Sequence, residues 1–151
     1  MIRVELTRIF AIPPDAAFAY ITDMANWKHF FPGFVRIENP AEARWGRTGD
    51  RVTVRARRFG RESELQMELH EFHPAERVSF VLRQRGLPDM RHERLFRATS
   101  GGCECRFVAA YEPRTGLVGL VDGLLVKQAL VRSFNSALSK LEPLLRDQLP
   151  K

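Results

Sequence analysis

From Leu117 to Leu145 the sequence reads LVGLVDGLLVKQALVRSFNSALSKLEPLL. At 100° per residue, seven of its apolar residues fall on one narrow face of a helix. The seven are Leu120, Leu124, Val131, Phe134, Leu138, Leu141 and Leu145. This pattern predicts one long amphipathic helix near the end of the chain, with that face packed against the rest of the protein.

Residues 33–113, which precede this helix, have the period of two that is typical of strands, with frequent Gly, Pro and Asn. Pro13-Pro14-Asp15 starts the first of two short helices, and Pro32-Gly33 ends the second. Successive hairpins predict a twisted antiparallel sheet, so we expect an α+β fold in one domain over residues 1–151. The predicted strands are 3–12, 34–39, 50–59, 62–72, 77–85, 90–99 and 103–113.

The clearest hairpin joins residues 50–59 to residues 62–72 through Gly60-Arg61. If residue 59 lies opposite residue 62, apolar residues meet on one face and opposite charges meet on the other. The predicted pairs are Val52–Leu69, Val54–Met67, Ala56–Leu65, Arg57–Glu64 and Thr53–Glu68. We therefore interpret the arginine-rich run 55–58 as part of a solvated sheet face.

The composition describes a globular protein with a basic balance. Hydrophobic residues make up 44% of the 151 residues and the net charge is +6, which raises the question of an anionic partner. The arginines are scattered along strands, so we expect no nucleic-acid partner, while peripheral contact with an anionic surface stays open. No apolar run approaches the ~18 residues of a membrane span, and the first residues lack a signal-peptide pattern. We expect a cytoplasmic protein that is a monomer or a homodimer.

Cys103 and Cys105 are two apart in a predicted strand, so both point to one face with Cα atoms about 6.6–6.8 Å apart. That distance is at the far limit for a disulfide. Without a histidine cluster nearby, we interpret both as small buried residues and predict no metal site. The sequence also lacks a phosphate-binding loop, a dinucleotide fingerprint and a nucleophile elbow, so we predict no cofactor.

The strand 90–99 interrupts the apolar pattern. If its even residues face inward, His92 and Arg94 reach the concave side of the sheet, whereas the odd choice would bury three charges. Lys127 lies within the angular spread of the apolar helix face. Buried polar groups are costly unless they are paired, so this pattern predicts a concave side that is not wholly dry.

Each of these residues also has a structural interpretation. Lys127 would reach water past the sheet edge, and His92 would be a hydrogen-bonded core residue or lie on the outer face. Arg94 would pair at the rim with Glu93, Glu104 or Glu112. Tyr111 would be a core aromatic residue with its hydroxyl hydrogen-bonded, and Trp27 and Trp45 would close one end by packing.

Three segments resemble known families: PPDAAFAYITDMANWKHFFPGFVRIE near the start, HEFHPAERVSF in the middle, and YEPRTGLVGLVDGLLVKQALVRSFNSALSKLEPLL at the end. Together they resemble the SRPBCC superfamily of START-related, Bet v 1-like and polyketide cyclase/dehydrase-like proteins. The resemblance implies a helix-grip fold, in which a curved sheet of about six or seven strands wraps around the C-terminal helix. It also implies a cavity for a hydrophobic ligand, with the loop 112–119 as a flexible mouth.

The resemblance leaves the function open, because this fold serves many chemistries. The first hypothesis is binding of a hydrophobic small molecule: a lipid, an isoprenoid quinone or an aromatic polyketide-like compound. The alternative is an enzyme, a cyclase, dehydratase or hydrolase, with His92 and Tyr111 as candidate catalytic residues. A third is a contact with an acidic protein or membrane through the arginine-rich sheet. The predicted ligand-binding residues are His92, Arg94, Tyr111, Lys127, Leu124, Val131, Phe80, Met67 and Phe96.

Overall fold

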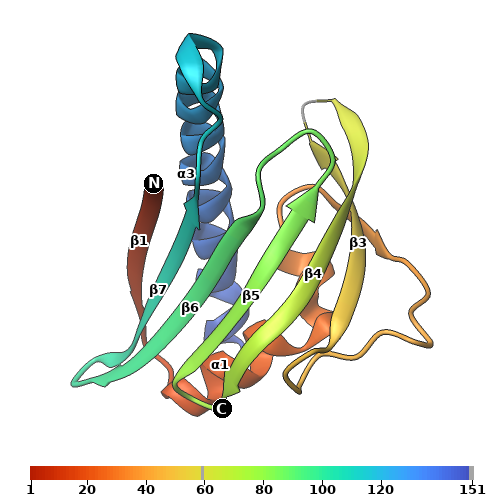
Figure 1. The fold of residues 1–151 in the computed structure, drawn as a ribbon. Coiled ribbons are helices and arrows are strands. Elements are labelled where there is room, and N and C mark those ends of the chain that lie inside the picture. Colours follow the sequence, from red (N-terminus) through yellow and green to blue (C-terminus); the bar gives the residue numbers. More distant parts are fainter. Residues whose placement is uncertain (59, 150–151) are drawn as a thin grey trace.

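A seven-stranded antiparallel sheet and one long helix across its inner face form the protein in the computed structural model, which describes residues 1–58 and 60–149 (Figure 1). The strand order is β1-β7-β6-β5-β4-β3-β2, and the long helix α3 packs on β1 at one edge and on α2. This architecture confirms the predicted helix-grip fold. The elements are β1 (Ile2–Phe10), α1 (Pro14–Thr22), the 3₁₀ helix η1 (Met24–Asn26), α2 (Trp27–Phe30), β2 (Phe34–Ile37), β3 (Arg51–Arg58), β4 (Arg61–His73), β5 (Arg77–Gln84), β6 (Met90–Thr99), β7 (Gly102–Tyr111) and α3 (Gly116–Arg146).

The register of the β3–β4 hairpin differs from the prediction by two residues. Arg58 lies opposite Arg61, so Val52 pairs with Met67 and Val54 with Leu65. Because side chains alternate with a period of two, a shift by two leaves every residue on its predicted face. The predicted partners were therefore wrong. The predicted inner face was right for Val52, Val54 and Ala56, but Arg58, which was assigned to the solvated face, points inward. In the observed pairing Arg57 lies opposite Glu62, Arg55 opposite Glu64 and Arg51 opposite Glu68.

The outer face of the sheet is charged in both signs. Arg55 Nε lies 2.8 Å from Glu38 Oε1, and Arg83 Nη1 lies 3.2 Å from Glu68 Oε2. Other arginines of this face have carboxylate partners on neighbouring strands, as Arg106 has in Glu5 at 3.1 Å. Exposed pairs of this kind contribute about 1 kcal/mol or less to stability. Their arrangement confirms that most of the arginines belong to a solvated sheet face, while contact with an anionic surface stays a prediction.

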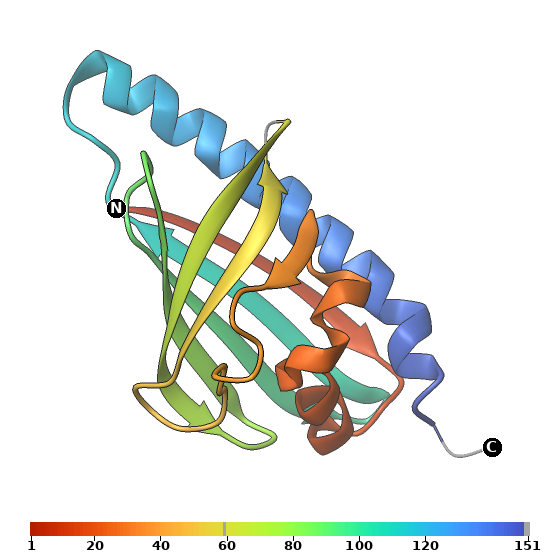
Figure 2. The same cartoon turned by 90° about the vertical axis from the view of Figure 1, so that its right-hand side faces the viewer.

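The two halves of α3 contact the protein differently. In the C-terminal half, Phe134, Leu138 and Leu141 are buried as predicted. In the N-terminal half the prediction was wrong, since Leu120 and Leu124 are 59% and 53% exposed. The helix projects past the sheet there (Figure 2), and the face it turns inward carries Gly123 rather than leucine.

Aromatic packing closes the end of the sheet covered by α1 and α2. Trp27 Nε1 donates to the carbonyl of Ile21 at 3.0 Å, and the Trp45 ring centroid lies 5.5 Å from those of both Trp27 and Phe80. Both tryptophans therefore serve packing. Cys103 and Cys105 are buried free thiols with sulfur atoms 3.7 Å apart. Within the described residues, no helix combines the length and apolar character needed to cross a bilayer.

Candidate functional site

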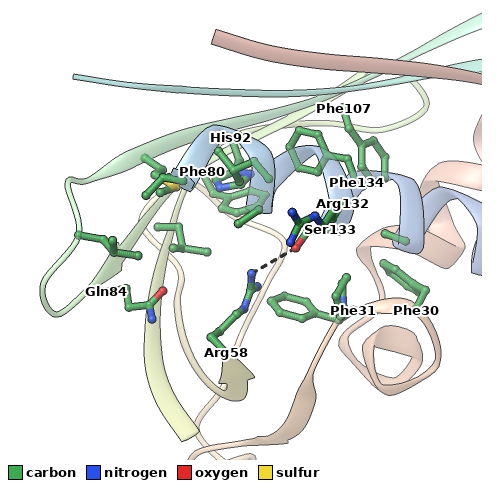
Figure 3. Close-up of a pocket in the computed structure, with 18 of the residues that line it drawn as sticks. Phe30, Phe31, Arg58, Phe80, Gln84, His92, Phe107, Arg132, Ser133 and Phe134 are labelled. Atoms are coloured by element: carbon green, nitrogen blue, oxygen red, sulfur yellow. Dashed lines mark hydrogen bonds between the residues drawn. The ribbon is translucent and has the colours of Figure 1, made fainter. Parts of the chain in front are cut away.

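A cavity of about 250 Å³ lies between α3 and the inner face of the sheet (Figure 3). Side chains from α2, β3, β5, β6, β7 and α3 line it, so elements far apart in sequence meet there. Most of the lining is apolar and much of it aromatic. The main lining residues are Phe30, Phe31, Arg58, Phe80, Leu82, Gln84, Met90, His92, Arg94, Phe107, Leu130, Ser133 and Phe134.

The cavity has a buried inner end and an accessible outer end. His92, Phe107 and Phe134 at the inner end are no more than 6% exposed, whereas Arg57 and Arg132 in the same lining are exposed. An apolar interior with a few polar groups and one wet end is the usual form of a small-molecule site.

His92 lies at the inner end, between aromatic rings. Its imidazole stacks on Phe80 with centroids 5.1 Å apart, and the edge-on Phe134 ring is 6.0 Å away. Neither ring nitrogen has a hydrogen-bond partner within the described residues. Burial lowers the pKa of His92 to about 3, and the charges of Arg94 and Arg58 add to this effect. His92 is therefore neutral at physiological pH, faces inward as predicted, and is not the hydrogen-bonded core residue of the alternative.

Arg94 lies against two aromatic rings of the cavity, one of which, Phe80, also stacks on His92. Its guanidinium carbon lies 4.4 Å from the centroid of Phe107 and 5.4 Å from that of Phe80, within cation–π range. The carboxylates considered as its rim partners pair elsewhere: Glu93 with Arg77, Glu104 with Arg97, and Glu112 with the amino terminus. Burial lowers the pKa of Arg94 to about 10, so it keeps its charge at neutral pH.

Arg58 is a cavity residue that the sequence interpretation missed. It follows Val52, Val54 and Ala56 on the inner face of β3, so strict alternation would have placed it inward. Its Nη1 donates to Ser133 Oγ on α3 at 3.4 Å, and its guanidinium lies 5.9 Å from the Phe31 ring centroid (Figure 3). Burial lowers the pKa of Arg58.

The cavity brings together three of the nine predicted ligand-binding residues: Phe80, His92 and Arg94. The other six lie elsewhere. Leu124, Lys127 and Val131 line a separate open groove on α3, which corrects the inward placement of Lys127. Lys127 does not face inward because the inner face of this half of the helix carries Gly123. Met67 borders a small void beside Trp45, Phe96 packs on Phe18 with centroids 5.2 Å apart, and Tyr111 donates to a backbone carbonyl.

Tyr111 provides a direct test of these placements. Its buried hydroxyl donates to the carbonyl of Gly123 at 2.7 Å and does not line the cavity. We expect Tyr111→Phe to lower the free energy of unfolding by about 1 kcal/mol, through loss of one buried hydrogen bond. Binding of a hydrophobic probe should be unchanged. Denaturant unfolding and a probe titration on the same sample check both statements, and a variant that stays folded but loses probe binding would contradict the placement.

No metal centre is formed by the part of the chain that the structure describes. There, no three His, Cys, Asp or Glu side chains come together as a ligand group. The polar side chains that line the cavity are Arg57, Arg58, Arg94, Arg132, Gln84, His92 and Ser133, beside several aromatic rings.

The chain belongs to the family described as "Polyketide cyclase / dehydrase and lipid transport", which matches residues 1–146. Membership supports a role in binding or converting a hydrophobic small molecule. No curated protein matches the sequence.

Solved structures share the fold at low sequence identity. The Zhui aromatase/cyclase from Streptomyces sp. R1128 has a TM-score of 0.80 at 13% identity, covering 99% of this chain and 96% of its own. A protein from Thermus thermophilus has a TM-score of 0.79 at 18% identity, covering 99% of this chain and 100% of its own. DynU16, a protein of the dynemicin biosynthetic locus, has a TM-score of 0.69 at 15% identity, covering 95% of this chain and 47% of DynU16.

Proposed function

We propose that the protein binds a compact, largely aromatic small molecule in the cavity between α3 and the sheet. The observation that carries the proposal is the aromatic cavity itself, which is about 250 Å³ in volume and buried at its inner end. Sites for drug-sized ligands span roughly 300–1,000 Å³, so this volume favours a ligand of a few rings over a diacyl lipid or a long isoprenoid quinone. Of the three ligand classes considered from the sequence, the aromatic polyketide-like compound fits best.

Burial of apolar surface supplies the driving force. A ligand entering the cavity contacts Phe31, Phe80, Phe107 and Phe134, which offer both ring faces and ring edges. Each Å² of apolar surface removed from water contributes about 25 cal/mol, and offset or edge-on aromatic contacts add to this. The ring geometry therefore favours a flat ligand.

Native mass spectrometry of protein purified from its own cells tests the proposal. We expect a population heavier than the bare chain by the mass of a small molecule, and solvent extraction should release that molecule for identification. If the bare chain is the only species and it takes up no aromatic probe such as 2-naphthamide, the proposal is wrong.

A cavity-filling variant tests where the ligand lies. Ala129 lines the cavity from α3, so Ala129→Phe should fill much of the space and lower probe affinity by at least about 10-fold. Gln128→Phe makes the same change one residue away, where the side chain is exposed, and should bind normally. Fluorescence titration of 2-naphthamide compares the two variants, and equal loss in both or in neither would place the ligand outside this cavity.

A cyclase or dehydratase is the second candidate, and the free ring nitrogens of His92 favour it. A neutral imidazole beside the guanidinium of Arg94 can accept a proton from a carbon next to a carbonyl, while the cation stabilises the resulting enolate oxygen. The low pKa of His92 makes it a weak base in the ligand-free protein, which is why we place binding first. Conversion of a polyketide substrate that survives His92→Gln would exclude this role.

A further inference from the structure

We propose that the cavity contains an anion subsite, in which the guanidinium groups of Arg94 and Arg58 together hold a negatively charged oxygen of the ligand. The ligand is then an aromatic acid or an acidic phenol or enol, rather than a neutral hydrocarbon-like molecule. This inference rests on the proposed binding function and specifies the chemical class of its ligand.

Arg94 and Arg58 are half-buried cations inside the cavity, and holding them there is costly. A cation that leaves water for an apolar interior loses several kcal/mol of solvation unless an opposite charge compensates it. Arg94 lies against Phe80 and Phe107, and the buried Nε of Arg58 has no hydrogen-bond partner within the described residues. Cation–π contacts return only part of that cost. Two such cations in one cavity therefore indicate a binding site for an anionic ligand.

The charged side chains that line the cavity are all positive among the described residues. Among the described residues that border the cavity there are four arginines and no aspartate or glutamate. The outer face of the same sheet differs, because arginines there lie within 4 Å of carboxylates. Of the four arginines, Arg58 on β3 and Arg94 on β6 lie on the inner face, where no carboxylate of the described residues pairs with them, whereas Arg57 belongs to the outer face of β3 and Arg132 is exposed on α3.

Neutral hydrogen-bond donors line the cavity together with the two cations. His92 is 6% exposed, and both its ring nitrogens are without partners within the described residues. A neutral imidazole has one N–H, which can donate to an anionic oxygen. Ser133, which already accepts from Arg58, has a hydroxyl hydrogen of its own. Two cations and two neutral donors can satisfy the lone pairs of a carboxylate or an enolate.

Three probes of matched shape test the subsite: 2-naphthoate carries a carboxylate, 2-naphthamide is its neutral isostere, and 2-naphthol is the phenol. We expect 2-naphthoate to bind roughly 10- to 100-fold more tightly than 2-naphthamide, because its hydrogen bonds are charge-assisted. If the subsite holds a phenolate instead, bound 2-naphthol should ionise at a lower pH than free 2-naphthol. The absorbance spectrum of 2-naphthol reports its ionisation. The anion subsite requires at least one of these two results, tighter binding of 2-naphthoate or ionisation of bound 2-naphthol at lower pH.

The variants Arg94→Met and Arg58→Met should remove the preference for the anionic probe and leave 2-naphthamide binding nearly unchanged. Arg51→Met is the matched control, because Arg51 lies on the outer face of the same strand as Arg58, pairs with Glu68 and does not line the cavity. Removing a half-buried cation that has no carboxylate partner within the described residues should leave the melting temperature of the ligand-free protein unchanged or higher, so loss of folding is not expected.

The outcomes separate the two proposals. If no naphthalene probe binds, the proposed binding function fails. If 2-naphthamide binds but 2-naphthoate binds no better and 2-naphthol stays unionised, the anion subsite fails while the binding function stands. The subsite also fails if Arg51→Met reduces 2-naphthoate binding as much as Arg94→Met and Arg58→Met do.

Discussion

Lowering the pH from 6.5 to 3 should cost the wild-type protein on the order of 4 kcal/mol more stability than it costs a His92→Phe variant. The pKa of His92 is about 3 in the folded protein and about 6.5 in the unfolded chain. Between these values the unfolded chain binds a proton that the folded protein excludes, so the His92 contribution is present above pH 6.5 and is lost as the pH falls toward 3. Phenylalanine cannot titrate and keeps the stack on Phe80.

Urea unfolding at half-unit pH intervals measures this difference. Both proteins also lose the contributions of carboxylates such as Glu38, whose pKa the hydrogen bond from Arg55 lowers, so only the difference between the two curves reports on His92. Parallel curves for wild type and His92→Phe would contradict the burial of a neutral imidazole. A second variant, His92→Asn, guards against a packing effect that is specific to phenylalanine.

A second large effect is expected from Gly102→Ala, which should destabilise the protein by roughly 3–5 kcal/mol through backbone strain and overpacking. Gly102 begins β7 at a φ of +135°, a backbone conformation that residues with a side chain rarely adopt. A Cβ atom there would lie 2.1 Å from the carbonyl oxygen of Phe10 at the end of β1. The substitution therefore forces apart the two strands over which α3 packs at this edge.

Gly101→Ala is the matched control, because it changes the preceding residue of the same turn. A Cβ atom at Gly101 meets nothing within 4 Å, and its φ is outside the left-handed region. We expect a change within about 0.5 kcal/mol for this variant. Thermal or urea unfolding of both variants measures the contrast, and similar stabilities would show that the β1–β7 contact is looser than the structure describes.

Most of the fold could be predicted from the sequence because its signals are periodic. Alternating residues gave the strands and their faces, and the run of leucines gave the long helix. The hairpin register could not be settled in this way, because the observed pairing of Val54 with Leu65 and the predicted pairing with Met67 both join apolar residues. A choice between registers that differ by two depends on the turn around Gly60, which the face pattern does not contain.

The cavity was predicted only in part, for two physical reasons. The leucine pattern pointed to Leu124 as an inward residue, whereas the helix approaches the protein there through Gly123, which has no side chain to mark the contact. The charge of Arg58 argued for an outward side chain, although its place in the alternation of β3 pointed inward. A charged residue at an inward position of an alternating apolar strand thus indicates a binding site, even though its charge alone would predict an outward side chain.

The uncompensated positive charge in the cavity has a consequence for how long the protein survives in a cell. An empty protein bears part of the solvation penalty of the half-buried Arg58 and Arg94, whereas an occupied one gains RT ln(1 + [L]/Kd) in stability. Proteases act on the unfolded fraction, so a change of about 1–2 kcal/mol alters abundance several-fold. We therefore expect the amount of this protein in the cell to rise and fall with the supply of its ligand, because the ligand-free protein is degraded faster.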